Sequence, residues 1–170
     1  MDIFINNEVN DLVQTLEEEA ALEFGALYKD KNGNQYQLTR YWSDTLEKEL
    51  CLLEKLPRKE IPDLISIIFD IDDIEKVTAI CCEIADRNFD SNKEYRLDFI
   101  EKLERAYSSD VGDADKVRIC IGETMLFDAT NKDPIVGKSY EQIGNDAKFY
   151  RDISDRAKEI LDACEKKNKK

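Results

Sequence analysis

The stretch from Leu56 to Tyr107 reads LPRKEIPDLISIIFDIDDIEKVTAICCEIADRNFDSNKEYRLDFIEKLERAY, and it decides the predicted fold of this 170-residue chain. Apolar residues recur in it at helical spacing three times, and only a few residues connect one pattern to the next. A short amphipathic helix cannot bury its apolar stripe by itself. The three predicted helices must therefore stack against one another.

Helical spacing continues on both sides of this stretch. Gly25 marks the predicted end of the first helix, and Pro57 ends a leucine-rich one. The last helix opens at Ser139, which forms a predicted capping box with Gln142, and a loop at residues 128–138 precedes it. The predicted helices cover residues 6–24, 43–56, 58–69, 73–87, 93–107, 114–127 and 139–164.

Residues 27–42, LYKDKNGNQYQLTRYW, have a different pattern. Asn32-Gly33 is the strongest short signal for a hairpin turn, and aromatic and β-branched residues flank it. We expect a short β-hairpin or an ordered loop near residues 27–40. The aromatic side chains either anchor this segment to the core or form a contact surface, for which the candidates are Tyr36, Tyr41 and Trp42.

Together these patterns predict a mostly α-helical fold of about seven helices with one small hairpin. The acidic links at residues 70–73 and 109–113 are about 40 residues apart, which is the spacing of HEAT-like antiparallel helix pairs. An irregular helical bundle is the alternative. We expect a single helical domain over residues 1–170, with a helix-plus-hairpin appendage at 1–42, a helical stack at 43–165 and a frayed tail at 166–170.

Composition restricts the chemistry. The net charge is −13, with 38 acidic and 25 basic residues, which argues against nucleic acid and anionic membranes as partners and favours a basic protein. The chain has no histidine, the commonest general base and metal ligand. The five cysteines lie in apolar contexts and are expected to be reduced and buried. No stretch is apolar for long enough to span a membrane, so we expect a cytoplasmic protein.

Aspartate and glutamate gather in the two links between predicted helix pairs. Residues of this kind just before a helix usually cap it and complement its dipole. Placed along one edge of a helical stack, they would instead form a negative ridge that steers a basic partner. The residues concerned are Asp70, Asp72, Asp73, Glu75, Asp110, Asp113 and Asp115.

Residues 52–70, LLEKLPRKEIPDLISIIFD, combine a leucine-rich helix, a Leu-Pro break and an acidic-apolar helix that contains Ile-Pro. This pattern resembles the opening of the helical immunity proteins of bacterial polymorphic and contact-dependent toxin systems. The likeness to their Imm30-like family extends over residues 46–107. The resemblance implies short HEAT-type helix pairs, no catalytic residues, and a small cytoplasmic protein that binds one cognate toxin and blocks it.

These observations favour a binding protein rather than an enzyme. We expect an immunity protein that neutralises a basic, nuclease-type toxin by occlusion, without a cofactor or a metal ion. A helical scaffold or adaptor subunit is the alternative, and a carboxylate-dependent enzyme is a third possibility. The predicted partner-binding residues are Asp70, Asp72, Asp73, Glu75, Asp110, Asp113, Asp115, Tyr36, Tyr41 and Trp42.

Overall fold

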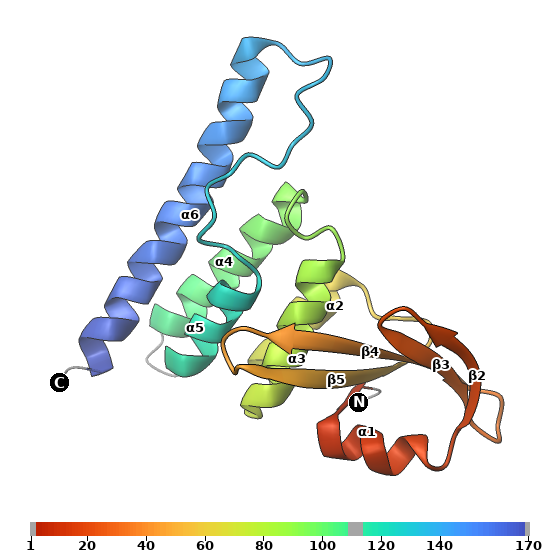
Figure 1. Cartoon of the computed structure of the whole chain (residues 1–170). Helices are drawn as coiled ribbons and strands as arrows, with labels where there is room; N and C mark the ends of the chain where they lie inside the picture. The colour runs from red at the N-terminus through yellow and green to blue at the C-terminus, as the bar shows by residue number, and fades with distance from the viewer. Residues whose placement is uncertain (1–2, 109–113, 169–170) are drawn as a thin grey trace. The chain divides into compact units, whose positions relative to one another are not determined.

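The computed structural model describes residues 3–108 and 114–168 of the chain. The chain divides into two compact units, residues 1–83 and 84–170, and the division falls within helix α3 (Ile74–Asp86). The described residues form six helices and five strands (Figure 1). All five strands belong to the first unit.

The first unit contains one antiparallel sheet in the order β1-β5-β4-β3-β2. Strand β5 is an inner strand, which pairs with β1 on one edge and with β4 on the other. Strand β1 is distant from β5 in the sequence, since Ile5 lies opposite Leu52. The strands are β1 (Ile3–Ile5), β2 (Glu17–Leu22), β3 (Gly25–Lys29), β4 (Gln35–Ser43) and β5 (Lys48–Lys55).

Strand β5 carries buried apolar residues on both of its faces, which suits an inner strand of the sheet. Leu50 and Leu52 are buried on one face, and Leu53 is buried on the other. A strand that is covered on both faces reads as a continuous apolar run rather than an alternating one. The run at residues 50–53 therefore suits a strand with helices on both sides of the sheet.

Helix α1 (Asn6–Val13) covers one face of the sheet, where Val9 packs with Ala26, Leu38 and Leu53. Helix α2 (Ile61–Phe69) and the first part of α3 cover the opposite face (Figure 1). Side-chain contacts hold α3 there, since the Tyr41 hydroxyl of β4 donates a hydrogen bond to the carboxylate of Glu83. The sheet is thus the middle layer of the first unit.

The predicted hairpin is confirmed as β3 and β4, which pair from Gly25 and Thr39 to Lys29 and Gln35. Gly33 has a φ of +84°, the left-handed conformation that its place in the turn requires. The Asp30 carboxylate accepts hydrogen bonds of 2.8 Å from the backbone N–H groups of Asn32 and Asn34. The turn residues alone therefore fix this connection, as the sequence indicates.

The second unit contains α4 (Lys93–Ser108), α5 (Ala114–Glu123) and α6 (Tyr140–Asn168). Helix α6 packs on both α4 and α5. The predicted capping box is confirmed: the Ser139 hydroxyl accepts from the Gln142 N–H at 3.2 Å, and the Gln142 side chain accepts from the Ser139 N–H at 2.8 Å. The core residues that these helices share are Phe99, Ile100, Leu103, Val117, Cys120, Ile121, Tyr150, Ile153 and Ala157.

The prediction of a mostly α-helical, HEAT-like or bundled fold is wrong, because the first unit is built on the five-stranded sheet. Two predicted helices are responsible. In residues 6–24, α1 ends at Val13 and β2 follows it, and residues 43–56 form β5 instead of a leucine-rich helix. Leucine favours helices in isolation, but pairing along both edges of a strand outweighs that preference. The five helices predicted from residue 58 onward are present with shifted ends.

Gly25 is needed where β3 approaches β4, and not at a helix end. A Cβ atom on Gly25 would lie 1.8 Å from the backbone oxygen of Leu38. We expect Gly25→Ala to force the two strands apart and to lower the free energy of unfolding by about 3 kcal/mol, measured by urea denaturation. The control is Gly144→Ala in α6, where nothing lies within 4 Å of an added Cβ and where alanine favours the helix. Equal effects of the two substitutions would contradict this account of Gly25.

Candidate functional site

The first unit has a groove on the α1 face of the sheet, with a volume of about 680 Å³. Helix α1 has eight residues and is about 12 Å long, whereas β4 has nine residues and extends about 30 Å. Tyr36, Leu38, Arg40 and Trp42 alternate along one face of β4. Tyr36 and Leu38 pack against the α1 core, and the groove lies beside it, toward Arg40 and Trp42.

Large apolar side chains stand exposed around this groove. Trp42 is 64% exposed, Phe24 68% and Leu22 41%, and all three line it. Buried residues of the core, Ala26 and Leu38, complete the apolar part of the lining. Contiguous exposed aromatic and aliphatic groups of this kind mark interaction sites, and tryptophan is prominent among residues that dominate binding energy.

Phe24 is held in place by the backbone. Glu23 and Phe24 form the two-residue connection between β2 and β3, where Leu22 lies opposite Gly25. The backbone oxygen of Phe24 accepts a hydrogen bond of 2.8 Å from the N–H of Arg40. The connection is thereby tied to β4, so the phenyl ring is presented to solvent from an anchored position.

The charged part of the lining is mainly acidic. Glu18, Glu23 and Glu49 contribute carboxylates, and Arg40 is the one cation among the lining residues of this groove. Burial raises the pKa of the Tyr28 phenol, and the charge of Glu18 raises it further. Three carboxylates around an aromatic surface favour a partner that combines positive charge with apolar groups.

Tyr41 connects the groove to a buried ionic network. Its hydroxyl donates a hydrogen bond to Glu83, which is fully buried and also pairs with Arg58. Arg58 reaches a second buried carboxylate, that of Glu54, at 3.5 Å, and Glu54 also accepts a 2.7 Å hydrogen bond from the Lys59 N–H. Both carboxylates thus have charged and hydrogen-bonding partners, which is the arrangement that buried acids need for stability.

The structure brings two of the three predicted aromatic residues together. Tyr41 and Trp42 both line the groove. Tyr36 instead packs against the α1 core, and its hydroxyl lies 3.4 Å from an oxygen of Asp30. The position of Tyr36 agrees with the hypothesis that the aromatic residues anchor the hairpin to the core.

The predicted acidic residues of the first unit, Asp70, Asp72, Asp73 and Glu75, are not among the lining residues of this groove. Asp70 ends α2, and Asp73 accepts a hydrogen bond from the Lys76 N–H at 3.1 Å, as an N-terminal cap does. Glu75 pairs with Lys48, and hydrogen bonding from Lys48 lowers the pKa of Glu75.

The second predicted cluster is described only in part. Asp115 pairs with Arg118 at 3.0 Å within α5. Asp110 and Asp113 lie outside the described residues. Asp72, the remaining residue of the first cluster, is exposed. One continuous acidic ridge formed by the two clusters stays a prediction.

Sequence reasoning missed most of the groove. The missed residues are Glu18, Leu22, Glu23, Phe24, Arg40 and Glu49. Residues 17–24 fit a helical pattern that stops at a glycine, and this pattern predicts that Phe24 lies on an apolar helix stripe. The signal that could have found them is the pair of similar short segments, Ala21-Leu22 and Ala26-Leu27, on either side of Glu23 and Phe24. Two short apolar segments separated by a few residues are also typical of a hairpin.

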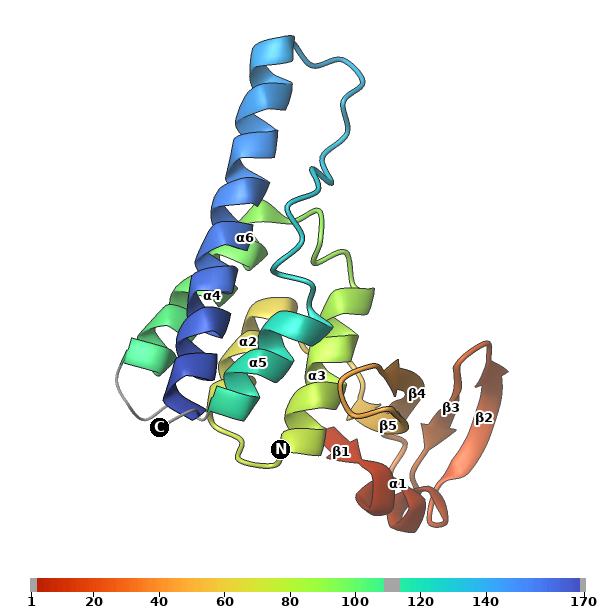
Figure 2. The ribbon, with the colours of Figure 1, turned by 60° about the vertical axis from the view of Figure 1, so that its left-hand side comes forward.

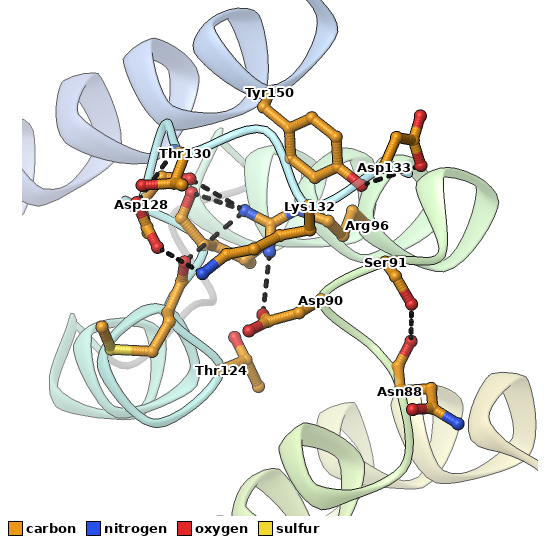
Figure 3. Close-up of polar contacts among 12 residues, drawn as sticks. Asn88, Asp90, Ser91, Arg96, Thr124, Asp128, Thr130, Lys132, Asp133 and Tyr150 are labelled. Atoms are coloured by element: carbon orange, nitrogen blue, oxygen red, sulfur yellow. Dashed lines mark hydrogen bonds and ion pairs between the residues drawn. The ribbon is translucent and has the colours of Figure 1, made fainter. Parts of the chain in front are cut away.

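The polar centre of the second unit is Arg96, which is fully buried (Figure 3). Its guanidinium lies 3.1 Å from Asp90 and 5.4 Å from the centre of the Tyr150 ring. The same group reaches the backbone oxygens of Met125, Leu126 and Asp128 at 3.5, 3.4 and 3.3 Å. Burial lowers the pKa of Arg96, and the Asp90 charge opposes that change. One cation therefore holds the segment after α5 against α4.

Two lysines and two aspartates form a second charged cluster in the same unit. Lys93 lies 2.5 Å from Asp133 and also pairs with Asp146. Lys138 lies 2.5 Å from Asp146 and 3.6 Å from Asp133. These four groups neutralise one another, and they join the start of α4, the loop at residues 128–138 and α6. Their arrangement stabilises the loop.

Over residues 3–108 and 114–168, no three cysteine, aspartate or glutamate side chains converge as the ligands of a metal ion would. No helix within these residues combines the length and the apolar character needed to cross a membrane.

Arg96→Met should destabilise the second unit strongly. The substitution keeps much of the volume but leaves backbone oxygens without a donor and Asp90 without its cation. We expect a loss of about 3 to 5 kcal/mol in the free energy of unfolding, measured by urea denaturation. Arg118→Met, which removes a surface pair with Asp115, is the matched control and should cost less than about 1 kcal/mol. Similar losses for both variants would rule out a central role for Arg96.

Acid should weaken the lysine–aspartate cluster. Hydrogen bonds from Lys138 and Lys93 lower the pKa of Asp146 to about 2. The pKa of an aspartate in an unfolded chain is about 3.9. Above that pH the ionised Asp146 stabilises the fold, and this contribution is lost as the pH falls toward 2. Urea denaturation at pH 5 and at pH 2.5 gives the loss of unfolding free energy caused by acid. This loss should be smaller in the Asp146→Asn variant than in the original protein. Parallel pH dependences would contradict this.

No family model, curated protein or solved structure matches this chain. The likeness of residues 52–70 to helical immunity proteins thus rests on the sequence pattern alone. The HEAT-type helix pairs implied by that likeness are not found at residues 46–56, which belong to the turn before β5 and to β5 itself.

Proposed function

We propose that this protein is an immunity protein, which binds a basic protein toxin and neutralises it by occlusion. The observation that carries the proposal is the groove in which Trp42 and Phe24 stand exposed between carboxylates. Exposed aromatic groups on an ordered sheet lose little conformational freedom on binding, so they serve well as anchors. A soluble monomer seldom leaves such groups uncovered without a function.

Charge supports the choice of partner. The net charge of −13 attracts a basic protein over several ångströms and speeds the encounter. Toxins that cleave nucleic acid are basic because they must bind phosphate groups. An acidic inhibitor that binds the basic surface of such a toxin competes with the nucleic acid for that surface. Under this proposal the protein acts in the cytoplasm, where it meets the incoming toxin.

An adaptor that joins two other proteins is a second candidate, and one observation favours it. The second unit has its own exposed apolar residues at the loop before α6, where Ile135 is 61% exposed, Val136 92% and Tyr140 96%. A protein with an apolar surface on each unit could bind two partners. An immunity protein needs only one of these surfaces, so the two functions differ in which surface is required.

Co-expression with the product of the neighbouring gene tests the lead proposal. That product should arrest growth by itself, and co-expression of this protein should restore growth and yield a purified complex. Isothermal titration then gives the dissociation constant. A neighbouring product that is harmless and forms no complex would defeat the toxin-inhibitor proposal.

Paired substitutions then test the groove. We expect Trp42→Ala with Phe24→Ala to weaken toxin binding about 30-fold or more, which corresponds to about 2 kcal/mol at an anchor, and to abolish the rescue of growth. Tyr140→Ala is the control, because it removes a 96% exposed aromatic side chain from the second unit. Loss of binding in Tyr140→Ala, with full binding in the groove variant, would place the contact on the second unit and favour the adaptor.

A further inference from the structure

Strand β2 is an outer strand of the sheet, beside β3 (Figure 2), and two of its residues, Glu18 and Leu22, line the groove. It pairs with β3 along one edge, and no strand of the described residues pairs with its other edge. All six residues of β2, Glu17–Leu22, are exposed. An edge strand presents a row of backbone N–H and C=O groups that can pair with another chain.

The free edge and the groove form one continuous surface. Glu18 and Leu22 belong to β2 and also line the groove, and Phe24 follows at the connection to β3. A strand added beside β2 would therefore run along the groove. Side chains on alternate positions of that strand would point toward the same face as Trp42.

The charge of β2 selects the kind of strand that can add to it. Glu17, Glu18 and Glu19 occupy half of the strand. The Glu19 carboxylate accepts a hydrogen bond of 2.8 Å from the Gln35 side chain and lies 3.4 Å from the Lys29 ammonium group. A second copy of this chain would bring its own three carboxylates against these, and like charges across strands are destabilising. A basic strand gains from the same carboxylates.

We propose that the partner binds by strand addition: an extended basic segment pairs with the free edge of β2 and places an apolar side chain in the groove beside Phe24 and Trp42. This inference rests on the groove of the proposed function and specifies how the partner occupies it. Backbone hydrogen bonds supply affinity in this mode, and alternate side chains supply specificity. Lysine or arginine on the added strand pairs with Glu17 and Glu18.

A synthetic peptide tests the inference without any toxin. The probe is an eight-residue peptide of alternating lysine and valine with blocked ends, and its comparator is the same peptide N-methylated at the six central amides. The comparator keeps the charge and the side chains but removes the backbone donors. We expect the probe to bind, the comparator to bind at least tenfold more weakly, and hydrogen exchange to slow only with the probe at those β2 amides that point away from β3.

Charge-reversed variants locate the contact. Glu17→Lys with Glu18→Lys should weaken binding of the probe at least tenfold. Glu60→Lys with Asp63→Lys makes the same change of charge on the same unit, at two exposed residues around the start of α2, and should alter binding less than twofold. Circular dichroism of both variants checks that they fold, and the hydrogen-exchange result on the unaltered protein stands without them.

Four outcomes would overturn strand addition: no binding of the probe at millimolar concentration, equal binding of the N-methylated peptide, equal losses in the two charge variants, or a dimer of this chain whose interface contains β2. Failure of the toxin-inhibitor proposal is separate. In that case the peptide binds as expected, while the neighbouring gene product is harmless or forms no complex.

Discussion

Pairing along both edges of β5 is the constraint on which the first unit depends. The strand lies between β1 and β4, and helices cover both of its faces. Its leucines Leu50, Leu52 and Leu53 are buried on both faces, so the strand depends on a completed sheet. The chain reaches this state by bringing Ile5 opposite Leu52, which closes the sheet before α2 begins.

The same sheet explains why a groove exists. Nine residues of β4 continue past the eight-residue helix that covers its first part. The alternation that buries Leu38 beneath α1 leaves Trp42, four residues later, on the uncovered side. The connection between β2 and β3 adds Phe24 from the neighbouring hairpin. Partial cover of a long sheet by a short helix thus produces an apolar surface whose border is acidic.

The second unit is organised by ionic contacts as well as by an apolar core. Arg96 donates hydrogen bonds to backbone oxygens of a segment without regular structure. Lys93 and Lys138 hold the loop before α6 by pairing with Asp133 and Asp146. A loop cannot supply its own backbone hydrogen bonds as a helix does, so buried side chains must supply them. This accounts for a fully buried cation in the more helical half of the chain.

The sequence by itself determined the features whose causes are local. Helices α2 to α6 follow from helical spacing, Ser139 and Gln142 form the expected cap, and Asn32-Gly33 forms the expected turn. Of the groove, only Tyr41 and Trp42 could be named from their residue type. The tertiary structure decided the rest, because a short apolar run fits a helix or a strand equally well until its partners are known. Those partners lie far away in the chain, and pairing with them made β5 a strand and left Phe24 and Trp42 exposed around one groove.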